Sequence, residues 1–135
     1  MGIILTGEPG IRYPRKSLIK TATRVLSILG CDDRSLSVVL VKGKTIQKLN
    51  KAYRRRDKQT DVLSFSTPSE IAKISGYIGE IFICVDVAKK NAKEDGHSLE
   101  KEITVLLVHG ILHLTGHDHS AKMFSLQKKI IKEVC

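Results

Sequence analysis

The 135-residue chain has no tryptophan, and its aromatic side chains are limited to three phenylalanines and three tyrosines. So few aromatic rings give little sign of a platform on which nucleobases stack, and sequence-specific reading of a nucleic acid is not expected. The chain also lacks a run of about 18 apolar residues and a basic segment before its first apolar stretch. A membrane-spanning helix and a secretory signal are therefore not expected, and we expect a cytoplasmic protein.

Cysteine is also scarce. The three cysteines, Cys31, Cys84 and Cys135, are odd in number and far apart, and no two of them form a Cys-x-x-Cys pair. This pattern predicts neither a disulfide framework nor a zinc site made of thiolates, and it fits a reducing compartment.

Positive charge is what the chain has in excess. Lysine and arginine number 23 against 14 aspartates and glutamates, which gives a formal net charge of +9 at pH 7. Such a surface attracts polyanions, so nucleic acid is the first partner to consider. The apolar and charged fractions, 41% and 27%, are ordinary for a globular protein. A chain of this length buries roughly two-thirds of its unfolded surface and needs no structural metal.

Apolar periodicity predicts one α+β domain that spans residues 1–135, with a mixed sheet of about four strands and about five helices. The histidines described below predict a metal site at the end of its buried central helix. The helix expected from Ser98 to Thr115 has apolar residues on most sides, which indicates that it is buried. The last two strands are expected to pair. Strands are predicted at residues 3–5, 36–41, 61–66 and 77–85, and helices at residues 17–30, 45–53, 87–95, 98–115 and 120–134.

The five histidines all fall between positions 97 and 119. His109 and His113 are four residues apart in the predicted buried helix, so their rings project from one face and can hold one ion. Gly116 can adopt a positive φ, which would return His119 to the same ion as a third ligand. One histidine on an apolar helix is usually a hydrogen-bonded core residue. Three imidazoles around one point need more partners, and these favour a metal.

Three histidine ligands with an open fourth position are typical of hydrolytic zinc sites. The spacing equals that of the metzincin proteases, whose general-base glutamate follows the first histidine, but this chain has Gly110 there. The chain therefore lacks the general base that a metzincin-type peptidase needs. Asp118 and Glu80 are the other candidates for proton transfer. Asp118 can equally orient a ligand histidine. His117 and His97 are expected to be exposed or structural and are not assigned to the metal.

Three blocks of the sequence resemble the YbeY family of bacterial metal-dependent endoribonucleases, which are rRNA maturation factors. The first resembles HGxLHLxGxDH and covers residues 109–119. The second resembles LNxxYRxxDxxTDVLSF and covers residues 49–65, and the third, G-[DE]-I, covers residues 79–81. Gln59 stands where the family usually has proline, which is expected to affect only a loop. Glu80 stands where many members have aspartate, which leaves its role open.

This resemblance implies an α+β fold, one zinc ion held by His109, His113 and His119, and hydrolysis of single-stranded RNA. It further implies a part in 3′-end maturation of 16S rRNA and in ribosome quality control. The charge of the chain agrees with it independently, because a +9 surface suits a phosphodiester polymer and suits a neutral peptide poorly.

By the same resemblance, Arg54 occupies the position of a functionally important arginine of the family. A guanidinium near a metal can clamp a phosphate and stabilise charge that develops on it. The neighbouring Arg55, Arg56 and Lys58 are expected to make non-specific contacts with the RNA backbone.

The expected partners are single-stranded RNA, rRNA and the small ribosomal subunit, with a ribosomal protein or an assembly GTPase as further candidates, and neither DNA nor a membrane. The competing interpretation is a non-catalytic RNA-binding assembly factor whose zinc is only structural. Structural zinc sites usually fill all four positions with protein ligands. Cys84 would favour this alternative if it supplied the fourth ligand. Imidazole ligands also suit nickel or copper, so the sequence leaves the metal open.

Overall fold

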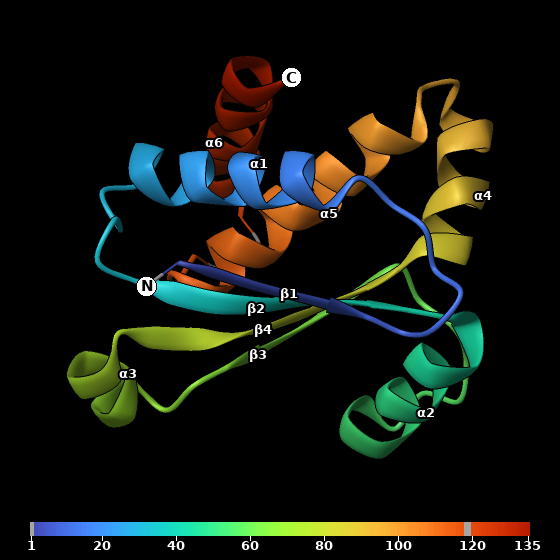
Figure 1. The fold of residues 1–135 in the computed structure, drawn as a ribbon, viewed down its shortest axis with the longest axis horizontal. Helices are drawn as coiled ribbons and strands as arrows, with labels where there is room; N and C mark the ends of the chain where they lie inside the picture. The colour runs from blue at the N-terminus through green and yellow to red at the C-terminus, as the bar shows by residue number, and fades with distance from the viewer. Residues whose placement is uncertain (1, 118–119) are drawn as a thin grey trace.

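The computed structural model describes residues 2–117 and 120–135, and within them it has four strands and six helices (Figure 1). This mixture confirms the predicted α+β class, with one helix more than expected. The strands are β1 (Ile3–Gly7), β2 (Ser35–Val41), β3 (Val62–Ser66) and β4 (Tyr77–Cys84). The helices are α1 (Arg15–Ile28), α2 (Gly43–Arg54), α3 (Ser69–Ser75), α4 (Val85–Asp95), α5 (Leu99–Leu114) and α6 (Ala121–Val134).

The four strands form one mixed sheet in the order β1-β2-β4-β3. Strands β1, β2 and β4 are parallel, and β3 runs antiparallel to β4 with Ser64 opposite Ile81. The predicted pairing of the last two strands is therefore confirmed. In this order β3 lies at an edge of the sheet, and one side of its backbone is not paired with another strand.

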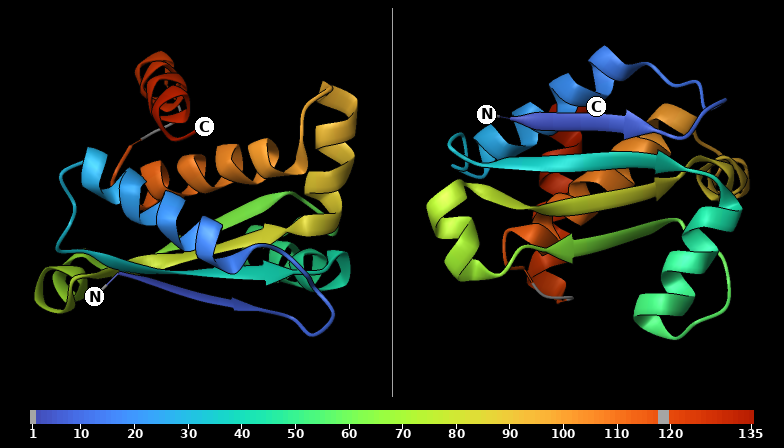
Figure 2. Two further views of the ribbon diagram at one scale, coloured as in Figure 1. Left: turned by 45° about the horizontal axis from the view of Figure 1, so that its top comes forward. Right: turned by 60° about the horizontal axis from the view of Figure 1, so that its bottom comes forward.

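One face of the sheet is covered by α1 and α5, and α6 packs outside them against both helices (Figure 2). Helix α5 is the central element of this layer, because it also contacts α4, β3 and β4. Ile81 and Ile83 of β4 and Leu107 and Ile111 of α5 are fully buried in the core between the sheet and the helices. The predicted burial of this helix is confirmed, and its position brings its C-terminal half close to the edge strand β3.

The opposite face of the sheet has a smaller core under α2. Val41, Ile46, Leu63 and Cys84 are buried there, and Phe65 and Phe82 pack against them. This second core holds α2 against the sheet. The basic segment that follows Arg54 therefore begins beside the sheet.

One helix and several boundaries differ from the sequence prediction. Residues 69–75 form the short helix α3, where a loop was expected; Pro68 precedes its first turn and Gly76 ends it in the left-handed conformation. None of its residues is buried, so no apolar face marked it in the sequence. Helix α4 begins at Val85, directly after β4, and α2 begins at Gly43 rather than at Thr45. Among the described helices, none has the length and apolar character needed to cross a membrane.

Candidate metal centre and cationic cleft

Helix α5 carries two of the three histidines that were predicted as ligands. It begins after Ser98, whose side-chain oxygen accepts a hydrogen bond from the backbone N–H of Lys101 at 3.1 Å. It ends at Leu114, and Gly116, which follows with a φ of 90°, lets the next N–H donate to the carbonyl of Leu112 at 3.0 Å. The imidazole Nδ1 of His117 lies 3.2 Å from the same carbonyl, so this half-buried ring closes the helix end.

The rings of His109 and His113 converge on one point. Their Nε2 atoms are 3.1 Å apart, and their ring centroids are 4.7 Å apart. Two nitrogens that each bind a tetrahedral zinc at about 2.0–2.1 Å are roughly 3.3 Å from one another. The donor atoms and their separation therefore fit a shared zinc ion.

Two side chains of α6 contact the ring of His109 from the side away from His113. The Nδ1–H of His109 donates to Oε1 of Gln127 at 2.8 Å. The ring of Phe124 stacks over the same imidazole, with centroids 6.4 Å apart and planes 22° apart. Helix α6 thus contributes directly to the orientation of this histidine.

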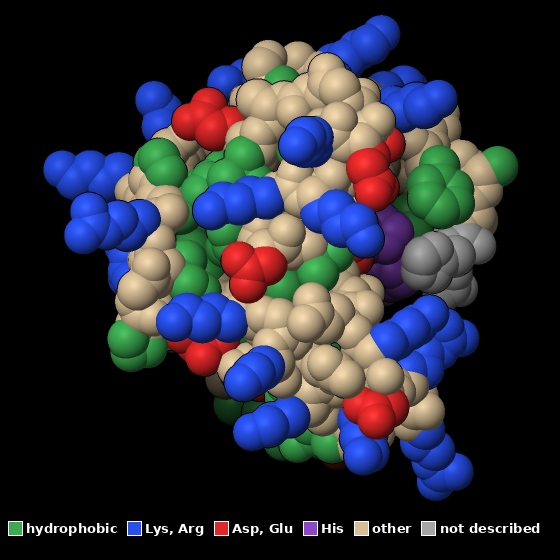
Figure 3. Space-filling model, turned by 90° about the vertical axis from the view of Figure 1, so that its right-hand side faces the viewer, with side chains coloured by type: hydrophobic (Ala, Val, Ile, Leu, Met, Phe, Trp, Pro, Cys, Tyr) green, Lys and Arg blue, Asp and Glu red, His purple; other side chains and the backbone are tan. Residues whose placement is uncertain are grey.

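Both histidines open onto a cleft of about 960 Å³ between α5, β3 and the segment that follows α2. In the space-filling view, histidine side chains reach the surface between lysine and arginine side chains (Figure 3). The described side chains that line the cleft are Asn50, Arg54, Arg56, Lys58, Thr60, Asp61, Val62, Leu63, Ser64, Ser66, His109 and His113. The cleft therefore combines two imidazoles with three permanent positive charges.

Arg54 is the last residue of α2, and two contacts hold its side chain at the cleft. Its Nη2 donates to the backbone carbonyl of Ser64 on the edge strand at 3.2 Å. Its guanidinium carbon lies 5.9 Å from the centre of the Phe65 ring, which is a cation–π distance. The guanidinium is thus hydrogen bonded to the backbone of β3, and the side chain lines the same cleft as the histidines.

The residues after Arg54 separate into two groups. Arg55 follows the last residue of α2 in the left-handed conformation, with a φ of 58°, and is not among the described residues that line the cleft. Arg56 and Lys58 do line it. The buried Asn50 donates from Nδ2 to the carbonyl of Lys58 at 3.0 Å and so ties this segment to α2.

Asp61 is the acidic side chain among the described residues of the cleft. Its Oδ2 accepts a hydrogen bond from Nδ2 of Asn91 on α4 at 3.3 Å. Its backbone carbonyl accepts from the N–H of Cys84 at 2.8 Å, which extends the pairing of β3 with β4. The carboxylate is therefore held at the cleft from two neighbouring elements.

Glu80 does not reach the histidines. Its neighbour Ile81 packs against Gly110 of α5, where an added Cβ would lie 2.9 Å from Cγ2 of the isoleucine. Side chains alternate along a strand, so the exposed Glu80 lies on the other face of the sheet. The expectation that Glu80 could serve this centre as a base is therefore corrected.

Cys84 also lies away from the cleft. It is fully buried in the core under α2, and burial raises the pKa of its thiol. Within residues 2–117 and 120–135 it joins no group of ligand atoms with His109 and His113. The other two predicted site residues, Asp118 and His119, lie outside the described residues.

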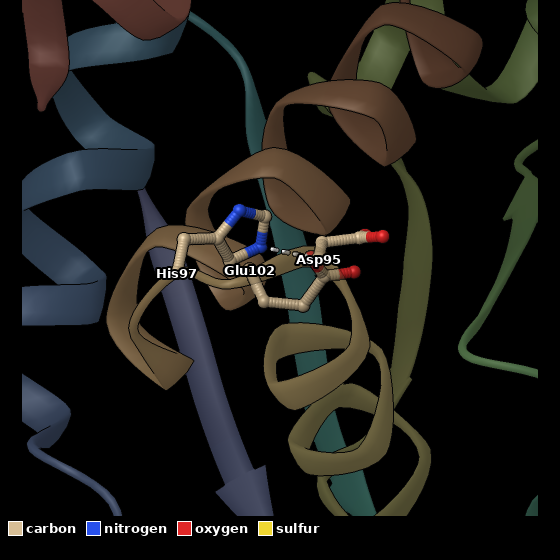
Figure 4. Close-up of side chains that lie close together, drawn as sticks. All are labelled: Asp95, His97 and Glu102. Carbon is tan, nitrogen blue, oxygen red and sulfur yellow. Dashed lines mark hydrogen bonds and ion pairs between the residues drawn. The ribbon is translucent and has the colours of Figure 1, made fainter.

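A second group of ligand-type side chains lies at the opposite end of α5. Asp95, His97 and Glu102 lie side by side, and one ligand atom of each lies within 4.8 Å of the others, close enough to hold a metal ion (Figure 4). Nε2 of His97 and Oε1 of the buried Glu102 are already hydrogen bonded at 2.6 Å. This bond gives the buried carboxylate a partner and connects the turn between α4 and α5.

Comparison with known proteins decides the family. A family model described as Endoribonuclease YbeY matches residues 11–135. The chain belongs to the YbeY family. Similar YbeY proteins include one from Aquifex aeolicus, 47% identical over 80% of this chain and 72% of its own length. Another, from Persephonella marina, is 38% identical over 98% of this chain and 92% of its own length, and both are named Endoribonuclease YbeY.

The fold has a solved counterpart as well. The solution structure of TM1509 from Thermotoga maritima is 34% identical, covers 98% of this chain and 88% of that one, and superposes with a TM-score of 0.70. The YbeY family match includes the whole cleft and all of α6.

Sequence reasoning missed three polar residues around this YbeY cleft. Asn50 and Asp61 fall within the sequence block at residues 49–65, and Gln127 falls within the helix predicted at residues 120–134, but no sequence pattern assigned a role to any of them. A buried asparagine in a helix is a signal that could have been used, because an amide is rarely buried without a bonding task. The roles of Asp61 and Gln127 depend on contacts with α4 and α5, which no local pattern announces.

Proposed function

We propose that this protein is a metal-dependent endoribonuclease that cleaves single-stranded RNA. The observation that carries the proposal is the convergence of the His109 and His113 Nε2 atoms, 3.1 Å apart, in a cleft lined by Arg54, Arg56 and Lys58. A zinc ligand pair alone would suit many hydrolases. Three cations that cannot all be balanced by the one carboxylate of the described cleft favour a polyanionic substrate. Membership of a family whose members are named endoribonucleases supports the same reaction.

In this proposal His109, His113 and His119 hold zinc, and residues 1–135 act as one functional unit. When bound, zinc supplies a Lewis acid that polarises a phosphoryl oxygen and lowers the pKa of water toward about 7. For Asp118 the proposal keeps the two roles predicted from the sequence, which are proton transfer and orientation of a ligand histidine. Asp61, the described carboxylate that lines the cleft, is the second candidate to accept a proton there.

Arg54 binds the scissile phosphate in the proposed mechanism. Its Nη2 is engaged by the carbonyl of Ser64, so the side chain is held before substrate arrives and loses little freedom on binding. The remaining guanidinium N–H groups can donate to phosphoryl oxygens as charge develops on them. Arg56 and Lys58 bind neighbouring phosphates of the strand, and Arg55 adds to the positive field beside the cleft.

The proposed biological substrate is the 3′ end of 16S rRNA, with roles in maturation and in ribosome quality control. The sequence resemblance supports this assignment, and so does the lack of a large aromatic platform for reading bases. Cytoplasmic action on the small ribosomal subunit, with contact to a ribosomal protein or an assembly GTPase, belongs to the same proposal.

The test is cleavage of an end-labelled single-stranded RNA by the wild-type protein and by His113→Ala purified in parallel, each with and without chelator. We expect activity only in the wild-type protein without chelator, and slower cleavage of a matched duplex. Equal activity in both preparations would reveal a contaminating nuclease. Binding of the RNA without cleavage in either preparation would instead favour the non-catalytic assembly factor with a structural zinc.

A further inference from the structure

Helix α6 contributes a polar side chain that contacts α5 through a proposed metal ligand. Gln127 lies on the half-buried side of α6, and its Oε1 is 2.8 Å from Nδ1 of His109. An amide oxygen can only accept a hydrogen bond, so this contact requires a proton on Nδ1. Phe124, three residues earlier on the same helix, stacks on the ring and restricts its rotation.

We propose that Gln127 is a positioning residue that fixes His109 in the tautomer required for binding a metal through Nε2. A neutral imidazole carries one proton, so a proton held on Nδ1 leaves the lone pair of Nε2 directed toward His113. The inference rests on the proposed metal site, because it assigns a role to Gln127 through one of its ligands. It concerns the state of the protein before the metal arrives.

The distance between the two histidines makes the proposal specific. Nε2 of His109 lies 3.1 Å from Nε2 of His113, so in the metal-free protein one of these atoms must donate a hydrogen bond to the other. With Nδ1 of His109 protonated by its bond to Gln127, the donor is Nε2–H of His113. Metal binding then requires only His113 to move its proton from Nε2, while His109 is already in the binding form.

Without Gln127, the two rings are no longer held with His109 protonated on Nδ1 and His113 protonated on Nε2. The variant removes the acceptor that holds a proton on Nδ1 of His109, so the fraction of His109 in the Nε2–H tautomer should rise. The fraction that carries a proton on Nε2 cannot bind zinc until that proton moves, so the apparent affinity falls. Partners that orient ligand histidines in this way typically contribute about 10–100-fold to metal affinity.

The experiment compares Gln127→Met, which keeps the length and loses the acceptor, with Gln127→Glu, which keeps an acceptor oxygen. Lys128→Met, at an exposed position on the same helix, is the matched control. Long-range proton–nitrogen NMR of the histidine rings is recorded on metal-free protein at about pH 8, where imidazole is ordinarily neutral. Zinc affinity is measured separately, by competition with a chromophoric chelator.

The wild-type protein, Gln127→Glu and Lys128→Met should show His109 protonated on Nδ1 and His113 on Nε2, whereas Gln127→Met should show His109 shifted toward Nε2–H. Zinc affinity should fall about 10–100-fold in Gln127→Met and be restored in Gln127→Glu. Retention of the Nδ1–H form in a folded Gln127→Met overturns the proposal. So does an equal loss of affinity in both glutamine variants, because that result indicates a role only in docking α6.

These readouts are independent of RNA cleavage. If the tautomer and the zinc affinity change as expected but the wild-type protein cleaves no RNA, the proposed enzymatic function fails and the positioning role stands. If Gln127→Met leaves both readouts unchanged in an active nuclease, the positioning role fails and the proposed function stands.

Discussion

Replacing Gly110 with alanine tests how closely α5 lies on the sheet beneath the histidines. An ideal Cβ at this position would be 2.9 Å from Cγ2 and 3.0 Å from Cδ1 of Ile81. The isoleucine is fully buried, and its Cγ2 is attached directly to its own Cβ, so it has little freedom to move aside. The helix and the strand must therefore separate to accept the methyl group.

Two effects of opposite sign set the magnitude. Alanine is favoured over glycine in a helix interior by about 1 kcal/mol, and overpacking a filled core costs about 1–3 kcal/mol. Because the new contacts are shorter than ordinary van der Waals distances, we expect overpacking to win and Gly110→Ala to lose about 1 kcal/mol of unfolding free energy. Ile81→Ala, which removes the facing atoms, should cost about 2–5 kcal/mol alone.

The double variant Gly110→Ala/Ile81→Ala separates the contact with Ile81 from the higher helix propensity of alanine. In the Ile81→Ala background the methyl group at position 110 enters vacated space, so Gly110→Ala should become stabilising, with a coupling of about 1–2 kcal/mol between the two sites. Urea unfolding of the four proteins, followed by far-ultraviolet circular dichroism with chelator present, measures this coupling. The reasoning is refuted if Gly110→Ala stabilises the wild-type protein by about 1 kcal/mol and adds to Ile81→Ala without coupling.

Three further predictions concern the cleft and the buried groups. Arg54→Ala should lower RNA cleavage about a hundredfold at unchanged zinc content, while Arg24→Ala, which removes the same charge from α1, should leave cleavage intact; loss of zinc in Arg54→Ala would contradict the assigned role. Because burial raises the pKa of the Cys84 thiol, a thiol reagent at neutral pH should modify the exposed Cys135 and spare Cys84 until urea unfolds the protein, as read by peptide mass spectrometry. Burial, and then the charge of Glu100, raise the pKa of Tyr13 from 10.0 to about 12, so the phenol's contribution to stability is complete below the lower value and is lost as the pH rises toward the higher. Chemical unfolding measured across this alkaline range should show that the free energy of unfolding falls more steeply with pH in the wild-type protein than in Tyr13→Phe. If it falls equally in both proteins, the raised pKa of Tyr13 is refuted.

Local signals were sufficient for the elements that carry their own caps and apolar faces. Helix α5 could be predicted because Ser98 caps its start, Gly116 ends it, and apolar side chains surround its axis. The convergence of His109 and His113 follows from the same helix, since residues four apart lie one above the other on one face. The spacing of four residues in a helix brings these two rings together whatever the rest of the fold.

The remaining site residues depend on how separate elements pack. Gln127 reaches His109 only because α6 lies across α5, and the amphipathic pattern of α6 does not reveal which of its polar residues faces an imidazole. Asp61 joins the cleft because the edge strand begins beside it and Asn91 of α4 holds its carboxylate. The short helix α3 was missed for a related reason, because it buries no residue and so has no apolar face to be read.

Position 110 connects the chemistry of the centre to this packing. Successive residues of a helix are separated by roughly 100°, so the residue after His109 faces β4 while the two histidines face the cleft. A glutamate there, as in the metzincin pattern, would place its Cβ 2.9 Å from Cγ2 of Ile81 in a filled core. Any carboxylate that transfers a proton at the proposed centre would therefore come from another element. Within the described part of the cleft, Asp61 is the carboxylate that another element supplies.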